Sequence, residues 1–197
     1  IPDPKSARAV LEVLIKISKP IIIAANKIDL PTSQKNLERL KDKVKDVYII
    51  PTSAEAELAL RKASEQGIIE YKEGKIKILK DIDEKRLKAL KYIEKNVLIP
   101  YGSTGVQETL ETCVFKVLKY VAVFPVEDIN KLTDSKGNVL PDVFLVPSTT
   151  TCRELAYMIH TEIGEKFLYG INVRNKERVG EDYVLQHRDI IKIVVAK

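Results

Sequence analysis

Two short polar segments, each directly behind an apolar run, hold the side chains of this chain that are best suited to recognising a ligand. The segments contain Asn26, Lys27 and Asp29 behind residues 21–25, and Ser53 and Ala54 behind residues 47–50. The Asp29 carboxylate can accept two hydrogen bonds from the N1 and N2 groups of guanine, whereas adenine offers no matching pair of donors. Because a mismatched base would leave buried polar groups unpaired, this chemistry predicts a site that selects guanine over adenine.

The other residues of the two segments have supporting tasks in this hypothesis. The Lys27 stem can lie along the plane of the base, and the Asn26 side chain can tie its loop to neighbouring loops. A backbone N–H of the Ser53-Ala54 loop can donate a hydrogen bond to guanine O6, an atom that adenine lacks. We therefore predict that both segments meet at one binding site.

The groups that would hold phosphates and magnesium do not appear in the sequence. A phosphate loop has the form Gly-x-x-x-x-Gly-Lys-Ser/Thr. Here the Gly74-Lys75 dipeptide is followed by Ile76, and Ile69 stands where the first Gly should be. Residues 134–137 spell the Asp-x-x-Gly of a magnesium loop, but they follow the base-reading segments and are typical of a turn. The sequence therefore indicates the base-recognition half of a nucleotide site without its catalytic half.

Length and composition predict a compact protein of one large or two small domains. The 197 residues are 45% hydrophobic and 31% charged, whereas disorder requires low hydrophobicity. No apolar run approaches the ~20 residues that span a bilayer, and no signal-peptide pattern opens the chain. We therefore expect a cytoplasmic protein without membrane contact. The sequence begins with Ile1 rather than Met, which we take as an indication of a longer polypeptide.

Cysteine usage and net charge narrow the classes of site and partner. Cys113 and Cys152 lie far apart and neither has a C-x-x-C partner. We therefore predict no metal site and no disulfide framework, and expect both cysteines to be small core residues. The net charge of +5 is compatible with RNA or the ribosome as a partner, but it is also ordinary for a soluble domain.

The first 50 residues have the pattern of a doubly wound α/β sheet. Apolar residues at helical spacing predict a helix over 5–18, and the run 21–25 predicts a strand that is buried on both faces. A helix marked by Leu37, Leu40 and Val44 and a strand over 47–50 follow. Such folds bind ligands at the carboxyl ends of their strands, where both polar segments lie.

The middle of the chain predicts an insertion of helices and one hairpin. A helix is expected over 55–66, a hairpin over 68–79 and a highly charged helix over 83–95. Ser103 or Thr104 is expected to cap the next helix. The apolar positions of that helix should pack on the sheet, and they are Val106, Leu110, Val114, Val117 and Leu118.

From about residue 121 the pattern changes to a small α+β unit of β-grasp type. Strands are predicted over 121–126, 143–146, 167–173 and 190–196. A capping box at Thr151 predicts a helix that ends at Ile163. His160 should finish this helix, and His187 should be solvated. A basic edge formed by Lys166, Arg174, Lys176 and Arg178 could face RNA or belong to a mixed surface with Glu165, Glu177 and Glu181.

The last segment resembles a TGS domain, the ubiquitin-like module of threonyl-tRNA synthetases, stringent-response enzymes and some GTPases. The matching residues are Val123-Phe124-Pro125-Val126-Glu127-Asp128, Gly137-Asn138-Val139-Leu140-Pro141-Asp142, Ala156-Tyr157-Met158-Ile159-His160-Thr161, Gly180-Glu181-Asp182-Tyr183-Val184-Leu185 and Asp189-Ile190-Ile191-Lys192-Ile193. Upstream, the matching residues are Ser53-Ala54-Glu55-Ala56-Glu57-Leu58-Ala59-Leu60-Arg61 and Tyr101-Gly102-Ser103-Thr104-Gly105-Val106-Gln107. Together these motifs resemble the YchF-like branch of the Obg-related GTPases in its archaeal form, over essentially the whole chain.

This resemblance implies an α/β chain with two parts. Residues 1–120 would be the carboxyl-terminal part of a doubly wound P-loop GTPase domain, with a helical and hairpin insertion over about 55–100. Residues 121–197 would be the TGS domain. The phosphate loop, switch regions and magnesium loop of the family would precede Ile1. Without the earlier strands, residues 21–25 would expose an edge and apolar faces.

The resemblance also implies ligands and partners. It implies GTP and GDP as ligands, Mg²⁺ in the full-length protein, and association of the TGS domain with RNA or the ribosome in translation. Many YchF proteins carry Glu at the last position of Asn-Lys-x-Asp and accept ATP, so Asp29 favours GTP. We predict that this chain alone binds GTP weakly and does not hydrolyse it.

Two alternatives share parts of this pattern. The chain could be a non-enzymatic RNA- or ribosome-binding module in which the remnant of the GTPase domain only supports the TGS domain. It could also be an accessory region of a synthetase or stringent-response enzyme, but such a region has no reason to carry Asn-Lys-x-Asp.

Overall fold

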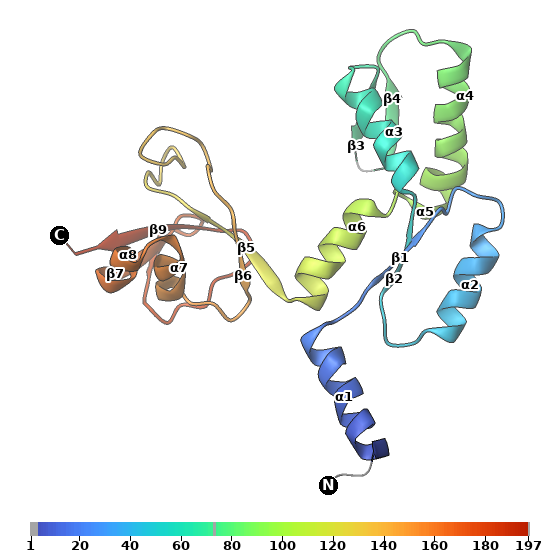
Figure 1. Cartoon of the computed structure of the whole chain (residues 1–197). Coiled ribbons are helices and arrows are strands. Elements are labelled where there is room, and N and C mark those ends of the chain that lie inside the picture. Colours follow the sequence, from blue (N-terminus) through green and yellow to red (C-terminus); the bar gives the residue numbers. More distant parts are fainter. Residues whose placement is uncertain (1–3, 73, 197) are drawn as a thin grey trace. The chain divides into compact units, whose positions relative to one another are not determined.

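The computed structural model describes residues 4–72 and 74–196, apart from the side chains of residues 4–7, 16 and 17 (Figure 1). The chain divides into two compact units, residues 1–113 and residues 114–197. Each unit is described by itself below. Among the described residues, no helix is both long and apolar enough to cross a membrane. The opening residue Ile1, on which we based the expectation of a longer polypeptide, lies outside the described part.

The first unit begins with the alternating helices and strands that the sequence predicts. They are α1 (Pro4–Ser18), β1 (Ile23–Asn26), α2 (Ser33–Lys43) and β2 (Ile49–Thr52). Strands β1 and β2 are parallel, in a register that pairs Asn26 with Thr52. Both strands start two residues later than predicted. Their shared direction brings the ends of the two strands, and the loops behind them, to the same edge of the sheet.

Strand β1 is less buried than its apolar run alone predicts, in agreement with the expectation that residues 21–25 expose an edge and apolar faces without the earlier strands. Ile21, just before the strand, is 67% exposed, and Ala24 is exposed while its neighbours are half-buried. Within the described residues β1 pairs only with β2, so the strand keeps an open edge and an incompletely covered face. The apolar side chains Val10, Leu11 and Leu14 of α1 are also more than half exposed. A continuously apolar strand needs cover from both sides, and the described chain does not provide it.

A helical insertion with its own apolar core follows β2. It contains α3 (Ala54–Glu65), the antiparallel hairpin β3 (Ile69–Lys72) and β4 (Lys75–Ile78), α4 (Glu84–Ile93), the π-helix η1 (Glu94–Leu98) and the short α5 (Ile99–Tyr101). These elements gather around one cluster of buried side chains, which are Ile28, Ala56, Leu60, Ile69, Leu90, Ile93, Val97 and Leu98. Ile28, from the loop behind β1, therefore belongs to the core of the insertion.

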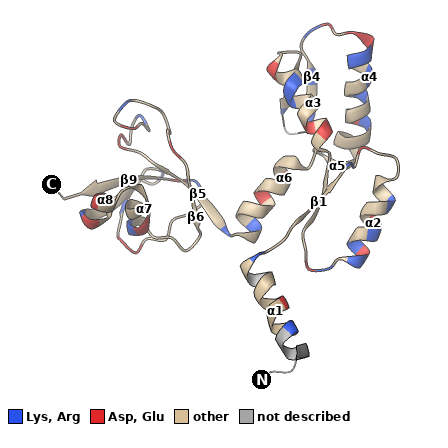
Figure 2. Cartoon of the chain, viewed as in Figure 1, with Lys and Arg blue, Asp and Glu red and all other residues tan. Residues whose placement is uncertain are grey.

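The exposed side of α4 is charged, as the sequence predicts (Figure 2). Lys88 pairs with Glu84 at 2.7 Å and Arg86 pairs with Asp83 at 3.3 Å, and all four side chains are more than half exposed. Exposed pairs of this kind contribute about 0–1 kcal/mol. They keep the helix soluble and do not indicate a ligand.

The start of the next helix differs from the prediction. Helix α6 (Val106–Glu111) is preceded by Gly105 at φ 75°, and neither Ser103 nor Thr104 caps it. A π-helix, η2 (Thr112–Val117), continues α6. Leu110 is 63% exposed, whereas the Thr109 hydroxyl lies 3.3 Å from the hydroxyl of Thr52 on β2. The polar side of the helix, rather than the predicted apolar one, thus meets the sheet.

The second unit is a β-grasp fold. Its strands are β5 (Tyr120–Pro125), β6 (Phe144–Pro147), β7 (Phe167–Asn172), β8 (Glu177–Val179) and β9 (Asp189–Val195), in the order β6-β5-β9-β7-β8. Strands β5 and β9 are parallel and the other pairs are antiparallel. Helix α7 (Cys152–Ile159) packs on the sheet and α8 (Thr161–Glu165) follows it. Cys152 is fully buried, and burial raises the pKa of its thiol to about 11. This cysteine is a core residue, as predicted.

The helix of this unit begins as predicted but ends earlier. Thr151 and Glu154 form the capping box, but α7 ends at Ile159 and not at Ile163. His160 is extended, and its Nδ1 accepts the N–H of Glu162 at 3.2 Å, so it caps α8. His187 is not simply solvated: its Nδ1 accepts the N–H of Ala122 at 3.2 Å.

Candidate nucleotide-recognition site

The two predicted loops meet at the carboxyl edge of β1 and β2, and Asn26 joins them. Its Oδ1 accepts the N–H of Lys27 at 2.8 Å and the N–H of Ala54 at 3.1 Å. Asn26 thus ties its loop to the neighbouring loop, as the sequence predicts. Of the two N–H groups of the Ser53-Ala54 loop, one of which is expected to donate to a base, that of Ser53 donates to the Thr104 carbonyl and that of Ala54 to Asn26. Donation from Ala54 to a ligand therefore requires Asn26 to share or release this N–H.

The Asp29 carboxylate is held in place by Ser53. The Ser53 hydroxyl donates to Asp29 Oδ1 at 2.8 Å and accepts the N–H of Ala56 at 3.3 Å as the cap of α3. Ser53 is 1% exposed, whereas Asp29 is half-buried. Each carboxylate oxygen has two lone pairs, so one hydrogen bond from Ser53 leaves capacity for the two that a guanine edge requires. The carboxylate is therefore oriented before any ligand arrives.

The backbone of the first loop is fixed through Ile28. Its side chain is 4% exposed, its N–H donates to the Thr52 carbonyl at 3.2 Å, and its carbonyl accepts the Ser33 hydroxyl at 2.7 Å. The preceding residue, Lys27, has φ 70°, in the left-handed region. This backbone places Ile28 in the core while Asn26 and Lys27 remain exposed.

Sequence reasoning missed Tyr92, which contacts the same loop from the insertion. The Tyr92 hydroxyl on α4 donates to the Asp29 carbonyl oxygen at 2.9 Å. Tyr92 is 46% exposed and lies outside the apolar stripe of α4. No sequence pattern links two residues that are 63 positions apart, so this contact had no detectable signal. It adds a second support to the loop that carries the carboxylate.

A third loop, residues 102–105, supports the Ser53-Ala54 loop. The Thr104 carbonyl accepts the N–H of Ser53 at 2.8 Å. Gly105 lies so close to β2 that a Cβ there would stand 1.9 Å from the Pro51 carbonyl oxygen. A glycine is therefore required both by this approach and by the positive φ. The sequence predicts a loop and a helix cap here, whereas the structure shows a loop that supports the Ser53-Ala54 loop and packs against β2.

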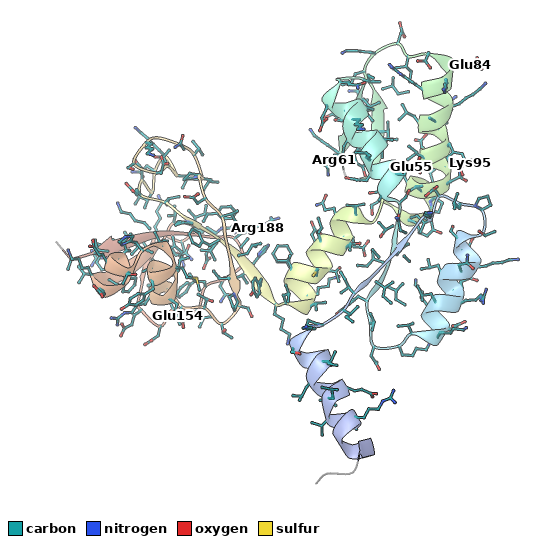
Figure 3. All side chains as sticks on the ribbon, in the orientation of Figure 1. Glu55, Arg61, Glu84, Lys95, Glu154 and Arg188 are labelled. Atoms are coloured by element: carbon teal, nitrogen blue, oxygen red, sulfur yellow. The ribbon has the colours of Figure 1, made fainter. Side chains whose placement is uncertain are left out.

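The side chain of Thr104 also fixes the first turn of α3. Its hydroxyl donates to Glu57 at 2.5 Å, and Arg61 Nε donates to the other oxygen of this carboxylate at 2.7 Å. Figure 3 shows Arg61 and Glu55 on the helix that this network holds. Partial burial alone would raise the pKa of Glu57, but the hydrogen bonds from Thr104 and Arg61 and the charge of Arg61 outweigh it and lower the pKa.

The segments with a superficial likeness to phosphate and magnesium loops have structural roles. Gly74 lies at the turn between β3 and β4, where a Cβ would stand 1.9 Å from the Gly102 carbonyl oxygen. Asp134 accepts the N–H groups of Lys136 and Asn138, as in the predicted turn. Within the part of the chain that the structure describes, no group of three or more His, Cys, Asp or Glu side chains is arranged to hold a metal ion.

Fold and site together define the class of protein: part of an α/β nucleotide-binding domain with a helical insertion, followed by a β-grasp domain. Residues 24–128 match the family described as the G4 motif-containing domain of YGR210-like Obg-like GTPases, and residues 134–195 match the TGS domain. The first match covers more than half of the chain, so the chain belongs to the YGR210-like Obg-like GTPases. The predicted combination of a partial GTPase domain and a TGS domain is thereby confirmed.

Similar proteins come from archaea and from yeast. A GTP-binding protein of Methanocaldococcus jannaschii is 54% identical over 185 residues, which are 93% of this chain and 47% of that protein. A GTP-binding protein of Schizosaccharomyces pombe is 29% identical over 80% of this chain and 41% of its own length. The crystal structure of a GTP-binding protein from Pyrococcus horikoshii is 45% identical and has a TM-score of 0.70, over 93% of this chain and 48% of that one. The chain thus spans about half the length of the relatives that it matches.

Proposed function

We propose that residues 1–113 supply the base-recognition half of a GTP-binding site. The observation that carries this proposal is the Asp29 carboxylate, held by Ser53 at the carboxyl edge of two parallel strands. The similar proteins of Methanocaldococcus jannaschii and Schizosaccharomyces pombe are named as GTP-binding proteins, which supports it. A carboxylate fixed before binding accepts the two donors of guanine without a reorganisation cost.

Each residue of the site has a distinct task in this proposal. Asp29 accepts from guanine N1 and N2, the Lys27 stem covers the base, and Asn26 holds the two loops together. Ser53 is a positioning residue that orients the carboxylate and does not touch the base. The Ala54 N–H donates to guanine O6 while it is still shared with Asn26 Oδ1, so the bond that ties the two loops is kept. Adenine would leave the carboxylate without its pair of donors, so discrimination against ATP should be strong.

Hydrolysis of GTP is proposed only for a longer protein. In-line attack on the γ-phosphate needs Mg²⁺ and phosphate-loop donors, and the described residues fit neither. Most of the affinity for GTP and GDP resides in phosphate contacts of that kind. We therefore expect this chain alone to bind GTP weakly and not to hydrolyse it.

The test is a titration of the chain with GTP and with ATP, each with Mg²⁺, followed by NMR chemical shifts of backbone amides and of the Asn26 side-chain amide. GTP should shift Asn26, Asp29 and Ala54, whereas ATP should not. The variant Asp29→Ala should lose the GTP response, and Asp42→Ala, an exposed carboxylate on α2, should keep it. Equal responses to both nucleotides, or an unchanged response in Asp29→Ala, would refute the proposal.

A base-swap variant makes the test more specific. Asp29→Asn replaces one acceptor oxygen by an amide donor. Xanthine carries a carbonyl at C2 where guanine carries an amine, so this variant should prefer XTP over GTP. A preference that did not change would show that Asp29 does not face the C2 edge of the base.

A second candidate function, RNA binding by the second unit, rests on one face of its sheet. Gly170 faces Cys152 of α7, so the alternating residues Tyr169 and Ile171 lie on the opposite face. There the Arg178 guanidinium lies 4.6 Å from the centre of the Tyr169 ring, and Lys192 is paired with Ile171 on the neighbouring strand. Aromatic and basic side chains together on a sheet are suited to stacking bases and contacting phosphates.

Association with RNA, and through it with the ribosome in translation, would follow from this face. Titration of a single-stranded oligouridine should show an affinity that falls steeply with salt. The affinity should fall further in Tyr169→Ala and Arg178→Ala, and should not change in Leu168→Ala, whose side chain is exposed next to Tyr169. A salt-independent affinity, or equal affinity in all three variants, would argue against an RNA-binding face.

A further inference from the structure

An apolar groove lies on the second unit, on the side of the sheet that faces the helices. Its volume is about 610 Å³, within the range of about 300–1,000 Å³ that is usual for ligand pockets. The floor is formed by Ile191 and Ile193 of β9, Phe144 of β6, and Ile159 and Ile163 of the two helices. The residues between β5 and β6 form its outer lip. None of these residues belongs to the candidate nucleotide site or to the Tyr169 face.

Every charged residue that lines the groove is acidic. These residues are Glu127, Asp134 and Asp142. The chain as a whole carries a net charge of +5, so this rim contrasts with the rest of the molecule. Glu127 and Asp142 are exposed, which leaves their carboxylates accessible to a cationic partner.

The lip of the groove is held in one conformation by its own hydrogen bonds. Asp134 accepts from the side-chain amide and the backbone N–H of Asn138, and these bonds lower the pKa of the Asp134 carboxyl. Asp128 accepts the N–H groups of Asn130 and Lys131, and the N–H of Leu140 donates to the Leu132 carbonyl. Such local bonds fix a turn without a regular strand. The groove is thus largely formed before a ligand binds.

Apolar side chains at the lip of the groove are exposed. Val143, which lines the groove, is 56% exposed, and Leu140, which precedes the lining residue Pro141 in the sequence, is 37% exposed. Exposed apolar residues that adjoin an apolar hollow indicate an interaction surface. The combination of an apolar floor with an acidic rim restricts the partner: phosphate groups of RNA or anionic lipids would be repelled.

We propose that this groove docks a basic amphipathic helix of a protein partner. A helix places apolar residues at i, i+3, i+4 and i+7 on one face, which suits an apolar groove of this volume. Lys and Arg on the flanks of the same helix would meet Glu127 and Asp142. The apolar floor supplies affinity, and the acidic rim selects basic partners over acidic ones.

The first experiment uses a designed peptide of about 16 residues, with Leu at the four helical anchor positions and Lys on the flanks. Its binding to the full chain is followed by the isoleucine methyl signals in NMR. The methyl groups of Ile159, Ile163 and Ile193 should shift, whereas that of Ile190, which alternates to the opposite face of β9, should not. A matched peptide with Glu in place of Lys should bind about tenfold more weakly at low salt, and the difference should shrink as salt is added.

Variants of the chain separate the two parts of the proposal. The charge reversal Glu127→Lys with Asp142→Lys should invert the preference between the two peptides. Val143→Asp should weaken the basic peptide about tenfold by placing a charge at the apolar lip. Leu145→Asp is the matched control, because Leu145 is 49% exposed on β6 but does not line the groove, and it alternates to the face opposite its groove-lining neighbour Phe144.

Several outcomes would overturn the proposal. One is equal or tighter binding of the acidic peptide, and another is equal loss in Val143→Asp and Leu145→Asp. A third is displacement of the peptide by oligouridine together with shifts at the same isoleucines, which would assign the groove to RNA. A fourth is a concentration-dependent dimer that Val143→Asp abolishes, which would assign the groove to a second copy of this chain.

Discussion

The Ser53 hydroxyl accepts the N–H of Ala56 at the start of α3 and donates to Asp29, while the Ser53 N–H donates to the Thr104 carbonyl. One small side chain therefore acts both as a helix cap and as the residue that orients a carboxylate. Because Ser53 is buried, water could not readily take the place of its hydroxyl, and removing the hydroxyl would leave hydrogen-bonding groups unpaired. At the residue scale, the site depends on groups that do not themselves contact a ligand.

Tyr92 is the second such group and gives the first prediction. The variant Tyr92→Phe removes the hydrogen bond to the Asp29 carbonyl while keeping the ring. Because the bond is present without ligand, its loss of about 0.5–1.5 kcal/mol lowers GTP affinity only as far as the free loop opens, so the decrease should be at most about twelvefold. The measurement is the GTP titration followed by NMR shifts at Asn26 and Ala54.

The control for this prediction is Tyr48→Phe, because Tyr48 is 50% exposed and immediately precedes β2. GTP affinity should be unchanged in that variant. If Tyr92→Phe and the unchanged chain bound GTP equally, Tyr92 would have no positioning role. The proposed GTP site itself would survive that result, since it is tested separately by Asp29→Ala.

At the scale of elements, the sequence predicts what depends on local pattern and misses what depends on close approach. The capping box at Thr151, the hairpin around Gly74 and the parallel strands behind Asn26 and Ser53 are all local patterns. The sequence pattern around Gly105 predicts the start of a capped helix, whereas the structure shows a loop that supports the Ser53-Ala54 loop. The glycine is required by the close approach of the Pro51 carbonyl, which lies 54 positions earlier in the sequence. No window along the sequence contains that contact.

The burial of β1 and the end of α7 depend on more than the local sequence pattern. Hydrophobicity indicates that a strand can be buried, but not which other strands cover it. His160 interrupts the apolar pattern of one helix with an extended residue and caps the next one. Sequence patterns predict the ends of elements less reliably than their types. Here two short helices follow each other, so the apolar pattern continues past the end of α7 at Ile159.

The network around Glu57 predicts a pH-dependent stability. Its pKa is lowered in the folded chain, so it stabilises the fold above its unfolded pKa of about 4.3, and this contribution is lost as the pH falls through the folded pKa. The variant Glu57→Gln should cost about 1–3 kcal/mol at pH 7 and progressively less below about pH 4.

This prediction is measured by urea unfolding of both chains at several pH values, followed by NMR signals of residues in α3. Glu55→Gln, an exposed position in the same first turn, is the control and should cost no more than the about 0.3–1 kcal/mol that a carboxylate contributes at a helix N-terminus. A cost of Glu57→Gln that stayed constant from pH 7 to low pH would show that the charge of Glu57 is not what stabilises α3.

At the scale of the whole molecule, we propose that the boundary between the GTPase part and the TGS domain lies near residue 114 and not at 120. The GTPase family match ends at residue 128 and the TGS match begins at residue 134, whereas the compact second unit begins at residue 114. Residues between these positions contact the second unit. The Phe115 ring packs edge-on against His187, with 4.7 Å between ring centroids, and the Lys119 carbonyl accepts the N–H of Ser148 at 2.9 Å.

This boundary gives a prediction for two pieces of the chain. The piece 114–197 should unfold cooperatively and be more stable than the piece 121–197 by about 1–3 kcal/mol, because the shorter piece loses the Phe115 ring, the Lys119 hydrogen bond and the first residue of β5. Thermal and urea unfolding of both pieces measure the difference. Phe115→Leu in the longer piece should account for part of it. Equal stability of the two pieces would place the boundary at 120.

Because Ile28 is buried in the core of the insertion, the first loop takes part both in the folding of the insertion and in the binding of a ligand at Asp29. The same few residues close the core of the insertion and present the groups that would bind a base. A ligand that binds the loop only when Ile28 is buried stabilises the insertion and should slow amide exchange in α4. Because coupling between two sites is reciprocal, an ordered insertion raises the affinity for that ligand by the same free energy. A molecule that binds only to α4 would then change the affinity of the proposed site for a nucleotide without contacting the base.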